Sequence, residues 1–258
     1  MNPFAAYKNY RRRRLLQRHA LDDALWQTAV SGSRLLHGLT APELTRLRQW
    51  VTLFLHAKQL STAGGLVLND HMRLSIALQA CLPILHLDLD YYDGWQEIII
   101  YPDEFVPEFN YMDEDGVVHH VHAPMSGEAW LGGPVILSWQ DADNAHEVPG
   151  YNVVIHEFAH KLDMLNGDAN GFPPLHADMN RQTWSSVFSA AFADFQRRVD
   201  TGEETELDPY AAENPGEFFA VISEVFYETP LVLLREYPEI YAQLRLFYRQ
   251  DPAQRQQY

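Results

Sequence analysis

The 258-residue sequence predicts an α+β fold in which helices precede and follow a small sheet. Apolar residues recur at helical spacing in the N-terminal third of the chain and again from about Pro149 onward. Between these parts lie short runs of β-branched and aromatic residues bounded by glycine and proline, which is typical of strands. Helices and strands that occupy separate stretches of a chain without an internal repeat indicate an α+β architecture.

Composition and charge exclude several classes of protein. The chain is 47% hydrophobic and 12% aromatic, which is too apolar for a disordered chain. The formal net charge is −16, but residues 1–20 carry six cations and no acid, so the rest of the chain carries −22. Because a body of that charge repels phosphate backbones, we expect no direct binding of nucleic acid.

The sequence also predicts a protein of the cytoplasm. It has no run of about 18 apolar residues that would cross a membrane, so we expect no membrane partner. The arginines near the N-terminus are not followed by the apolar stretch of an export signal. The one cysteine, Cys81, cannot form an intramolecular disulfide and is expected in the core.

The helices before the sheet are predicted from capping signals. Residues 1–34 are expected to form a basic leader, helical in part and a candidate for mobility, and residues 35–258 a single domain. The first helix is expected to begin at Thr40, because Thr40 suits the cap, Pro42 the first turn and Glu43 the third position. A second helix is expected from about Asp70 to Cys81, before Pro83.

Three strands are expected in the middle of the chain. Residues 98–101 and 135–139 are rich in β-branched and aromatic side chains, and residues 116–119 are a third candidate. Glycine and proline on either side mark the ends of these runs.

A short motif on the following helix predicts a metal site. His156-Glu157-x-x-His160 places two imidazoles four residues apart, one above the other on the same helix face. Two such rings bind one Zn²⁺ while the intervening glutamate reaches the water on the metal. The apolar residues around the motif indicate a buried helix.

A catalytic zinc needs a third protein ligand, and the sequence offers several acids for it. The candidates lie on the next helix but one, at Glu213, Glu217, Glu224 and Glu228. Asn214 suits the cap of that helix and Pro215 its first turn. Glu217 is then either a metal ligand or the acid of a capping box with Asn214, and its position alone does not decide between them.

Two further acids are candidates for supporting the metal ligands. Asp163 lies on the same helix face as His156 and His160 and is expected either to accept an imidazole N–H or to remain solvated beside Lys161 or an arginine. Glu224 is either a surface charge or a hydrogen-bond partner of a ligand.

The motifs together resemble one family. The segments 155–168, 208–212 and 214–224 resemble the Mlc titration factor A family and, in fold, the catalytic domain of anthrax lethal factor. The likeness also includes residues 81–85, 92–102, 126–130 and 247–252. It covers about residues 35–255 and leaves out the basic leader.

The resemblance implies a zincin-like fold and a zinc-dependent peptidase of the gluzincin type. It assigns the zinc ligands to His156, His160 and Glu217 and the general base to Glu157. A tyrosine seven residues before the ligand glutamate supports catalysis in lethal factor, and Tyr210 stands at that spacing. The family is described as having aminopeptidase activity, and its name comes from sequestering the glucose-system transcriptional repressor Mlc.

Two functions follow from this resemblance. The first is hydrolysis of a peptide bond by a zinc-activated water, with Glu157 as base and Tyr210 as oxyanion donor. The substrate is then expected to add as a strand along Val135, Ile136 and Leu137, although these residues equally suit a core strand. The alternative is a protein that binds the repressor, with a zinc site that is mainly structural or weakly active.

Overall fold

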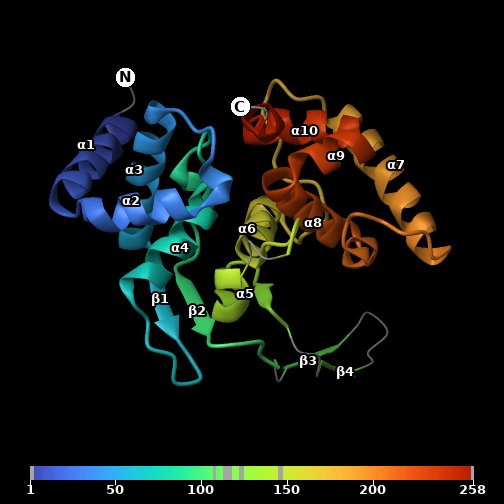
Figure 1. The fold of residues 1–258 in the computed structure, drawn as a ribbon, viewed down its shortest axis with the longest axis horizontal. Helices are drawn as coiled ribbons and strands as arrows, with labels where there is room; N and C mark the ends of the chain where they lie inside the picture. Colours follow the sequence, from blue (N-terminus) through green and yellow to red (C-terminus); the bar gives the residue numbers. More distant parts are fainter. Residues whose placement is uncertain (1–2, 107–108, 113–117, 122–124, 145–147, 257–258) are drawn as a thin grey trace.

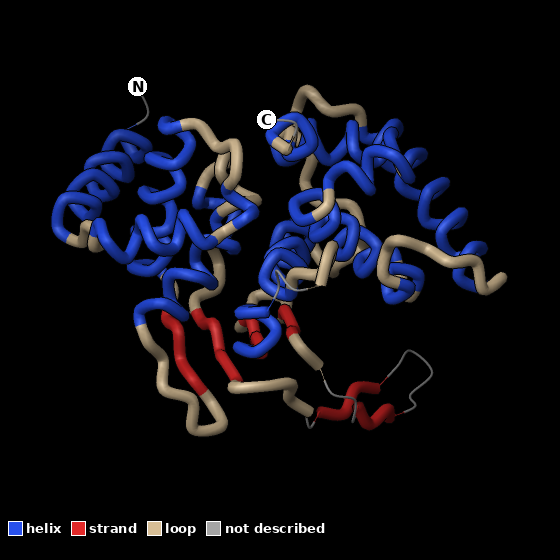
Figure 2. The backbone as a smooth tube through the Cα atoms, in the orientation of Figure 1, coloured by secondary structure: helices blue, strands red, loops and turns tan. Residues whose placement is uncertain are grey.

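The computed structural model describes residues 3–106, 109–112, 118–121, 125–144 and 148–256, and these are mainly helical (Figure 2). The N-terminal helices gather on one side of the molecule and the C-terminal helices on the other, with the central helices between them (Figure 1). The α-helices before the sheet are α1 (Pro3–Arg18), α2 (Asp23–Gly32), α3 (Ala41–Ala57) and α4 (Asp70–Cys81). The later ones are α5 (Trp139–Asn144), α6 (Val153–Asp163), α7 (Arg181–Asp200), α8 (Pro215–Glu228), α9 (Pro230–Glu236), α10 (Pro238–Tyr248) and α11 (Pro252–Arg255).

The predicted starts of α3 and α4 are confirmed. Thr40 and Glu43 form a capping box, because each side chain hydrogen-bonds the other residue's backbone N–H. Asn69 caps α4 by accepting the N–H of Met72 at 2.9 Å. Short 3-10 helices connect the longer elements, at η1 (Arg34–Leu36), η2 (Leu89–Tyr92), η3 (Met164–Asn166) and η4 (Pro209–Ala212).

The described part of the basic leader is helical, as expected in part, and forms α1 and α2. Arg12 on α1 reaches the start of η2, where it pairs with Asp88 and Asp90 at 2.8 Å. Helix α1 also contacts α3. The first helix therefore lies against the rest of the molecule, and a domain boundary at residue 34 stays a prediction.

Four strands form the sheet in the order β1-β2-β6-β5. They are β1 (Gln59–Thr62), β2 (Glu97–Tyr101), β5 (Gly127–Ala129) and β6 (Val135–Ser138). Strands β1, β2 and β6 are parallel, and β5 is antiparallel to β6. The sequence placed Trp139 in the last strand, but Trp139 begins α5. The mixed sheet and the surrounding helices confirm the predicted α+β class.

A separate pair of strands, β3 (Phe109–Met112) and β4 (Val118–Val121), is antiparallel. Strand β4 overlaps the third predicted strand, whose first two positions, 116 and 117, lie outside the described residues.

The prediction that a peptide adds along Val135, Ile136 and Leu137 is wrong. These residues form β6, whose two sides already pair with β2 and β5. Strand addition needs unpaired backbone N–H and C=O groups, which an inner strand does not offer. All four residues of β6 are buried, so the run is a core strand. Among the strands described in this sheet, the edges are β1 and β5.

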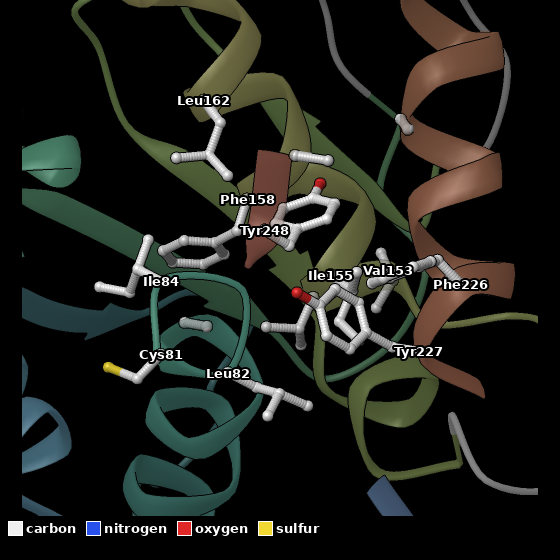
Figure 3. Close-up of a cluster of buried hydrophobic side chains, with 14 of the residues drawn as sticks. Cys81, Leu82, Ile84, Val153, Ile155, Phe158, Leu162, Phe226, Tyr227 and Tyr248 are labelled. Atoms are coloured by element: carbon white, nitrogen blue, oxygen red, sulfur yellow. The ribbon is translucent and has the colours of Figure 1, made fainter. Parts of the chain in front are cut away.

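The core lies around α6 and joins both groups of helices. Figure 3 shows Phe158 and Leu162 of α6 near Ile84 and Tyr248, with Ile155 and Val153 toward Phe226 and Tyr227. Cys81 is fully buried in this core, as predicted. Among the described residues, no helix combines the length and hydrophobicity that crossing a bilayer requires.

Candidate metal centre

The helix that carries the His-Glu-x-x-His motif is fixed at its start and buried along its length. Asn152 caps α6, because its side-chain oxygen accepts the N–H of Ile155 at 2.9 Å. Every residue of α6 is buried except His156, which is partly exposed. Such a helix holds its side chains in defined rotamers, as a metal site requires.

Helix α8 brings a carboxylate to the two histidines. Its cap is Asn214, whose side chain accepts the N–H groups of Gly216 and Glu217 at 2.9 and 3.0 Å. Glu217 does not complete a capping box, because its carboxylate is directed at α6 instead. The sequence left these two roles open, and the structure gives the cap to Asn214 alone.

Three side-chain atoms converge between the two helices. Glu217 Oε2 lies 3.0 Å from His156 Nε2 and 3.2 Å from His160 Nε2, and the two Nε2 atoms are 3.1 Å apart. Tetrahedral zinc with bonds of about 2.0–2.1 Å holds its ligand atoms about 3.3 Å apart. Two imidazoles and one carboxylate at these distances therefore fit a catalytic zinc with an open fourth position.

Within the described residues, His156, His160 and Glu217 form the one group of His, Cys, Asp or Glu side chains whose ligand atoms lie close enough to hold a metal ion. Of the other acids considered from the sequence, Glu213 is exposed and Glu224 and Glu228 contact different partners. Burial alone would raise the pKa of Glu217, but hydrogen bonds from both histidines, together with their charges, hold it well below its usual range. A carboxylate that stays ionised is the form that binds a metal.

Glu224 contacts the side of the His156 ring that faces away from Glu217. Its Oε1 atom lies 2.7 Å from His156 Nδ1, and its other oxygen accepts the backbone N–H of Asn152. The side chain of Glu224 is only 3% exposed, which excludes the surface-charge alternative. A carboxylate on Nδ1 fixes the tautomer that leaves Nε2 free to bind a metal.

Asp163 is buried beneath the loop that follows α6, which removes one of its two expected roles. It is fully buried, which excludes a solvated acid, and its Oδ2 accepts the N–H groups of Asn170 and Gly171 at 2.7 Å. Its Oδ1 and the Nδ1 atom of His160 are both buried without a hydrogen-bond partner among the described residues. Support of the His160 ring by Asp163 therefore stays a prediction.

Glu157 faces the same site as a buried carboxylate. The residue is 4% exposed, and its Oε2 has no hydrogen-bond partner among the described residues. Burial raises the pKa of Glu157 to about 7, although the charges of His156 and His160 act to lower this pKa. A carboxylate with such a pKa is suited to take up and release a proton near neutral pH.

Two contacts of α6 with the β5–β6 hairpin were not expected from the sequence. A Cβ atom on Gly127 of β5 would lie 2.4 Å from Glu157 Oε1 and 2.7 Å from Val153 Cγ2, so any larger residue here would displace this carboxylate. One turn further along α6, buried Lys161 donates to the backbone carbonyls of Trp130 and Gly133. No pattern in the sequence points to either contact, because both depend on how the strand meets the helix.

Tyr210 lies at the mouth of the site. It belongs to η4, is 46% exposed, and its ring centre is 6.2 Å from that of His156. Partial burial, together with the nearby charges of Glu217 and Glu213, raises the pKa of Tyr210, so the phenol stays protonated. Tyr210, Glu157 and the residues of β5 line one open cavity of about 700 Å³ that contains all three metal-binding side chains.

A His-Glu-x-x-His helix that faces a glutamate from a second helix, at the floor of an open cavity, defines a candidate metallopeptidase centre. The family model described as glucose-regulated metallo-peptidase M90 matches residues 7–249. The chain therefore belongs to this metallopeptidase family. Because the match begins at residue 7, the expectation that the basic leader lies outside the resemblance is wrong.

Named relatives agree with this assignment. Mlc titration factor A of Salmonella arizonae is 41% identical over 238 residues, which are 90% of this chain and 93% of that protein. The protein of the same name from Salmonella choleraesuis is 40% identical over 239 residues, which are 91% of this chain and 89% of that protein.

Proposed function

We propose that this protein is a zinc-dependent peptidase whose metal is held by His156, His160 and Glu217. The convergence of these three ligand atoms beside the buried Glu157 carboxylate is the observation that carries the proposal. Two imidazoles and a carboxylate are a usual donor set for a catalytic zinc.

Glu157 is the general base of the proposed reaction. Bound zinc supplies Lewis acidity toward the scissile carbonyl and lowers the pKa of a water at the site. Glu157 takes a proton from the attacking water and then delivers it to the leaving amine. Its Oε2, which has no hydrogen-bond partner in the described part of the chain, and its pKa of about 7 support this role.

Tyr210 and the edge of the sheet complete the proposed site. Tyr210 lines the cavity with a protonated phenol, so it is suited to donate a hydrogen bond to the oxyanion. The substrate binds along β5, because β5 is an edge strand and its residues line the same cavity. The resemblance to peptidases described as aminopeptidases favours cleavage near the N-terminus of a peptide. We expect the protein to act in the cytoplasm.

The metal and the base are tested by two variants. Glu157→Gln keeps the three ligands, so we expect one zinc per chain and a loss of peptide hydrolysis of at least about 100-fold. Normal cleavage by this variant would overturn the role of Glu157.

Glu217→Ala removes a ligand, and we expect the zinc affinity of this variant, measured by competition with a chelator, to fall at least about 100-fold. Unchanged affinity would return Glu217 to a structural role.

A second function is proposed from the names of the relatives, which are called Mlc titration factor A. We expect this chain to bind an Mlc-like repressor through a surface separate from the catalytic groups. Binding of such a repressor, measured by calorimetry, should then survive Glu157→Gln. Loss of binding in that variant would tie the interaction to the peptidase site.

A further inference from the structure

Helix α1 carries six of the chain's cations, and two of them attach it to the body. Lys8 pairs with Asp90 and with Asp93, and Arg12 pairs with Asp88 and Asp90. The Arg12 guanidinium also lies 5.3 Å from the centre of the Trp50 ring on α3. The inner face of α1 is therefore neutralised by acids of the body and held in place.

The outer face of α1 is different. Tyr7, Tyr10, Arg11, Arg14 and Arg18 recur at helical spacing and form one face, which we call the arginine stripe. All five side chains are exposed, and the two tyrosines are 62% and 60% exposed. Within the described part of the chain, the three arginines have no ion pair or hydrogen-bond partner for their side chains. The stripe is about 16 Å long, at about 1.5 Å of rise per residue.

The stripe has the opposite charge to the rest of the protein. Outside residues 1–20 the chain carries −22, whereas the stripe presents three positive charges that have no acidic partner among the described residues. Helix α1 lies at the outer edge of the molecule, away from α6 and α8 (Figure 1). Because charges are screened over about 8 Å at physiological salt, the positive potential of the stripe is local.

We propose that the arginine stripe is a docking surface for an acidic segment of a partner protein. Guanidinium groups match carboxylates with paired hydrogen bonds, and exposed tyrosines add donors and flat contact area. A short carboxylate-rich segment touches only the stripe. A long nucleic acid or an anionic bilayer would also face the acidic body, which repels it. The stripe contains no group of the metal centre, so docking is independent of catalysis.

The test uses a fluorescein-labelled 16-residue oligoglutamate peptide and fluorescence anisotropy with the full chain. We expect saturable binding at 50 mM NaCl that weakens at 200 mM. The triple variant R11E/R14E/R18E should bind at least about 10-fold more weakly, and R11Q/R14Q/R18Q should lose a smaller factor. The matched control is R197E/R235E/R245E, which changes the net charge equally at exposed arginines that already have acidic partners. Its affinity should stay within about 2-fold of the original protein.

Three outcomes would overturn the proposal. The first is no saturable binding of the peptide at low salt. The second is an equal loss in the control triple variant, which would assign the effect to bulk charge. The third is tighter binding of a 16-nucleotide oligothymidine, or of phosphatidylserine vesicles, through the same arginines. Circular dichroism of each variant, with helix content equal to that of the original protein, shows that α1 is intact.

Discussion

At the scale of single residues, the candidate centre depends on what stands next to each ligand. Glu224 contacts His156 Nδ1, and Gly127 leaves the space that the Glu157 carboxylate occupies. The sequence identified His156, Glu157 and His160 because their spacing alone defines the helix face. It left Glu217 and Glu224 ambiguous, since an acid on a helix has the same appearance as a cap, a ligand or a surface charge.

Replacing Gly127 should affect catalysis and not metal binding. In Gly127→Ala the new Cβ would meet Glu157 Oε1 at 2.4 Å and Val153 Cγ2 at 2.7 Å, so the carboxylate must move. We expect kcat to fall at least about 10-fold, because small displacements of a catalytic group are costly. Zinc content should remain at one per chain. Gly32→Ala, where nothing lies within 4 Å of the new atom, is the control. Equal activity of both variants would contradict the account.

Replacing Glu224 should weaken metal binding, because Glu224 contacts the Nδ1 atom of the ligand His156. In Glu224→Gln an amide takes the place of the carboxylate that holds both His156 Nδ1 and the N–H of Asn152. We expect zinc affinity to fall about 10- to 100-fold, as for other groups that support a ligand histidine. Chelator competition measures this change. Glu213→Gln, at an exposed acid of the same cavity, should leave affinity unchanged. A loss in both variants would indicate bulk electrostatics instead.

At the scale of elements, α8 carries three acids that face the start of α6. Glu217, Glu224 and Glu228 are separated by seven and four residues, so they share one helix face. Glu217 contacts both histidines. Glu224 contacts His156 and Asn152, and Glu228 contacts Asn152 alone of these residues. The starts of α6 and α8 are set by their caps, Asn152 and Asn214, of which the sequence predicted Asn214. How the two helices meet is a matter of packing that no single segment encodes.

Glu228, the last of these acids, is expected to make the stability of the folded protein depend on pH. Burial raises the pKa of Glu228 to about 7, so the folded protein binds its proton more tightly than the unfolded chain does. Glu228 therefore lowers stability progressively as pH rises from about 4.5 through 7. Glu228→Gln should raise the melting temperature by a few degrees at pH 8 and leave it unchanged at pH 4.5. Calorimetry at both pH values measures the melting temperature, and Glu204→Gln, at an exposed acid, is the control. No gain at pH 8 would contradict the account.

At the scale of the whole molecule, the sheet order decides where a peptide can bind. In this sheet the sequence predicted β2 and β6 but not β1 or β5, and it could not give the strand order, because pairing depends on segments far apart in the chain. It therefore left Val135–Leu137 open as either a substrate-binding strand or a core strand, and the structure places this run inside the sheet between β2 and β5. Likewise, the sequence could not show what the basic leader contacts, because the acids that pair with α1 lie about 80 residues further along the chain.

The central claim is that His156, His160 and Glu217 hold a zinc ion. X-ray absorption at the zinc K-edge of the zinc-loaded protein tests it most directly. We predict two imidazole nitrogens and oxygen donors at about 2.0–2.1 Å, with no sulfur ligand. The imidazole count should drop to one in His160→Ala. A first shell that contains sulfur at about 2.3 Å, or one imidazole or none in the original protein, would contradict the account.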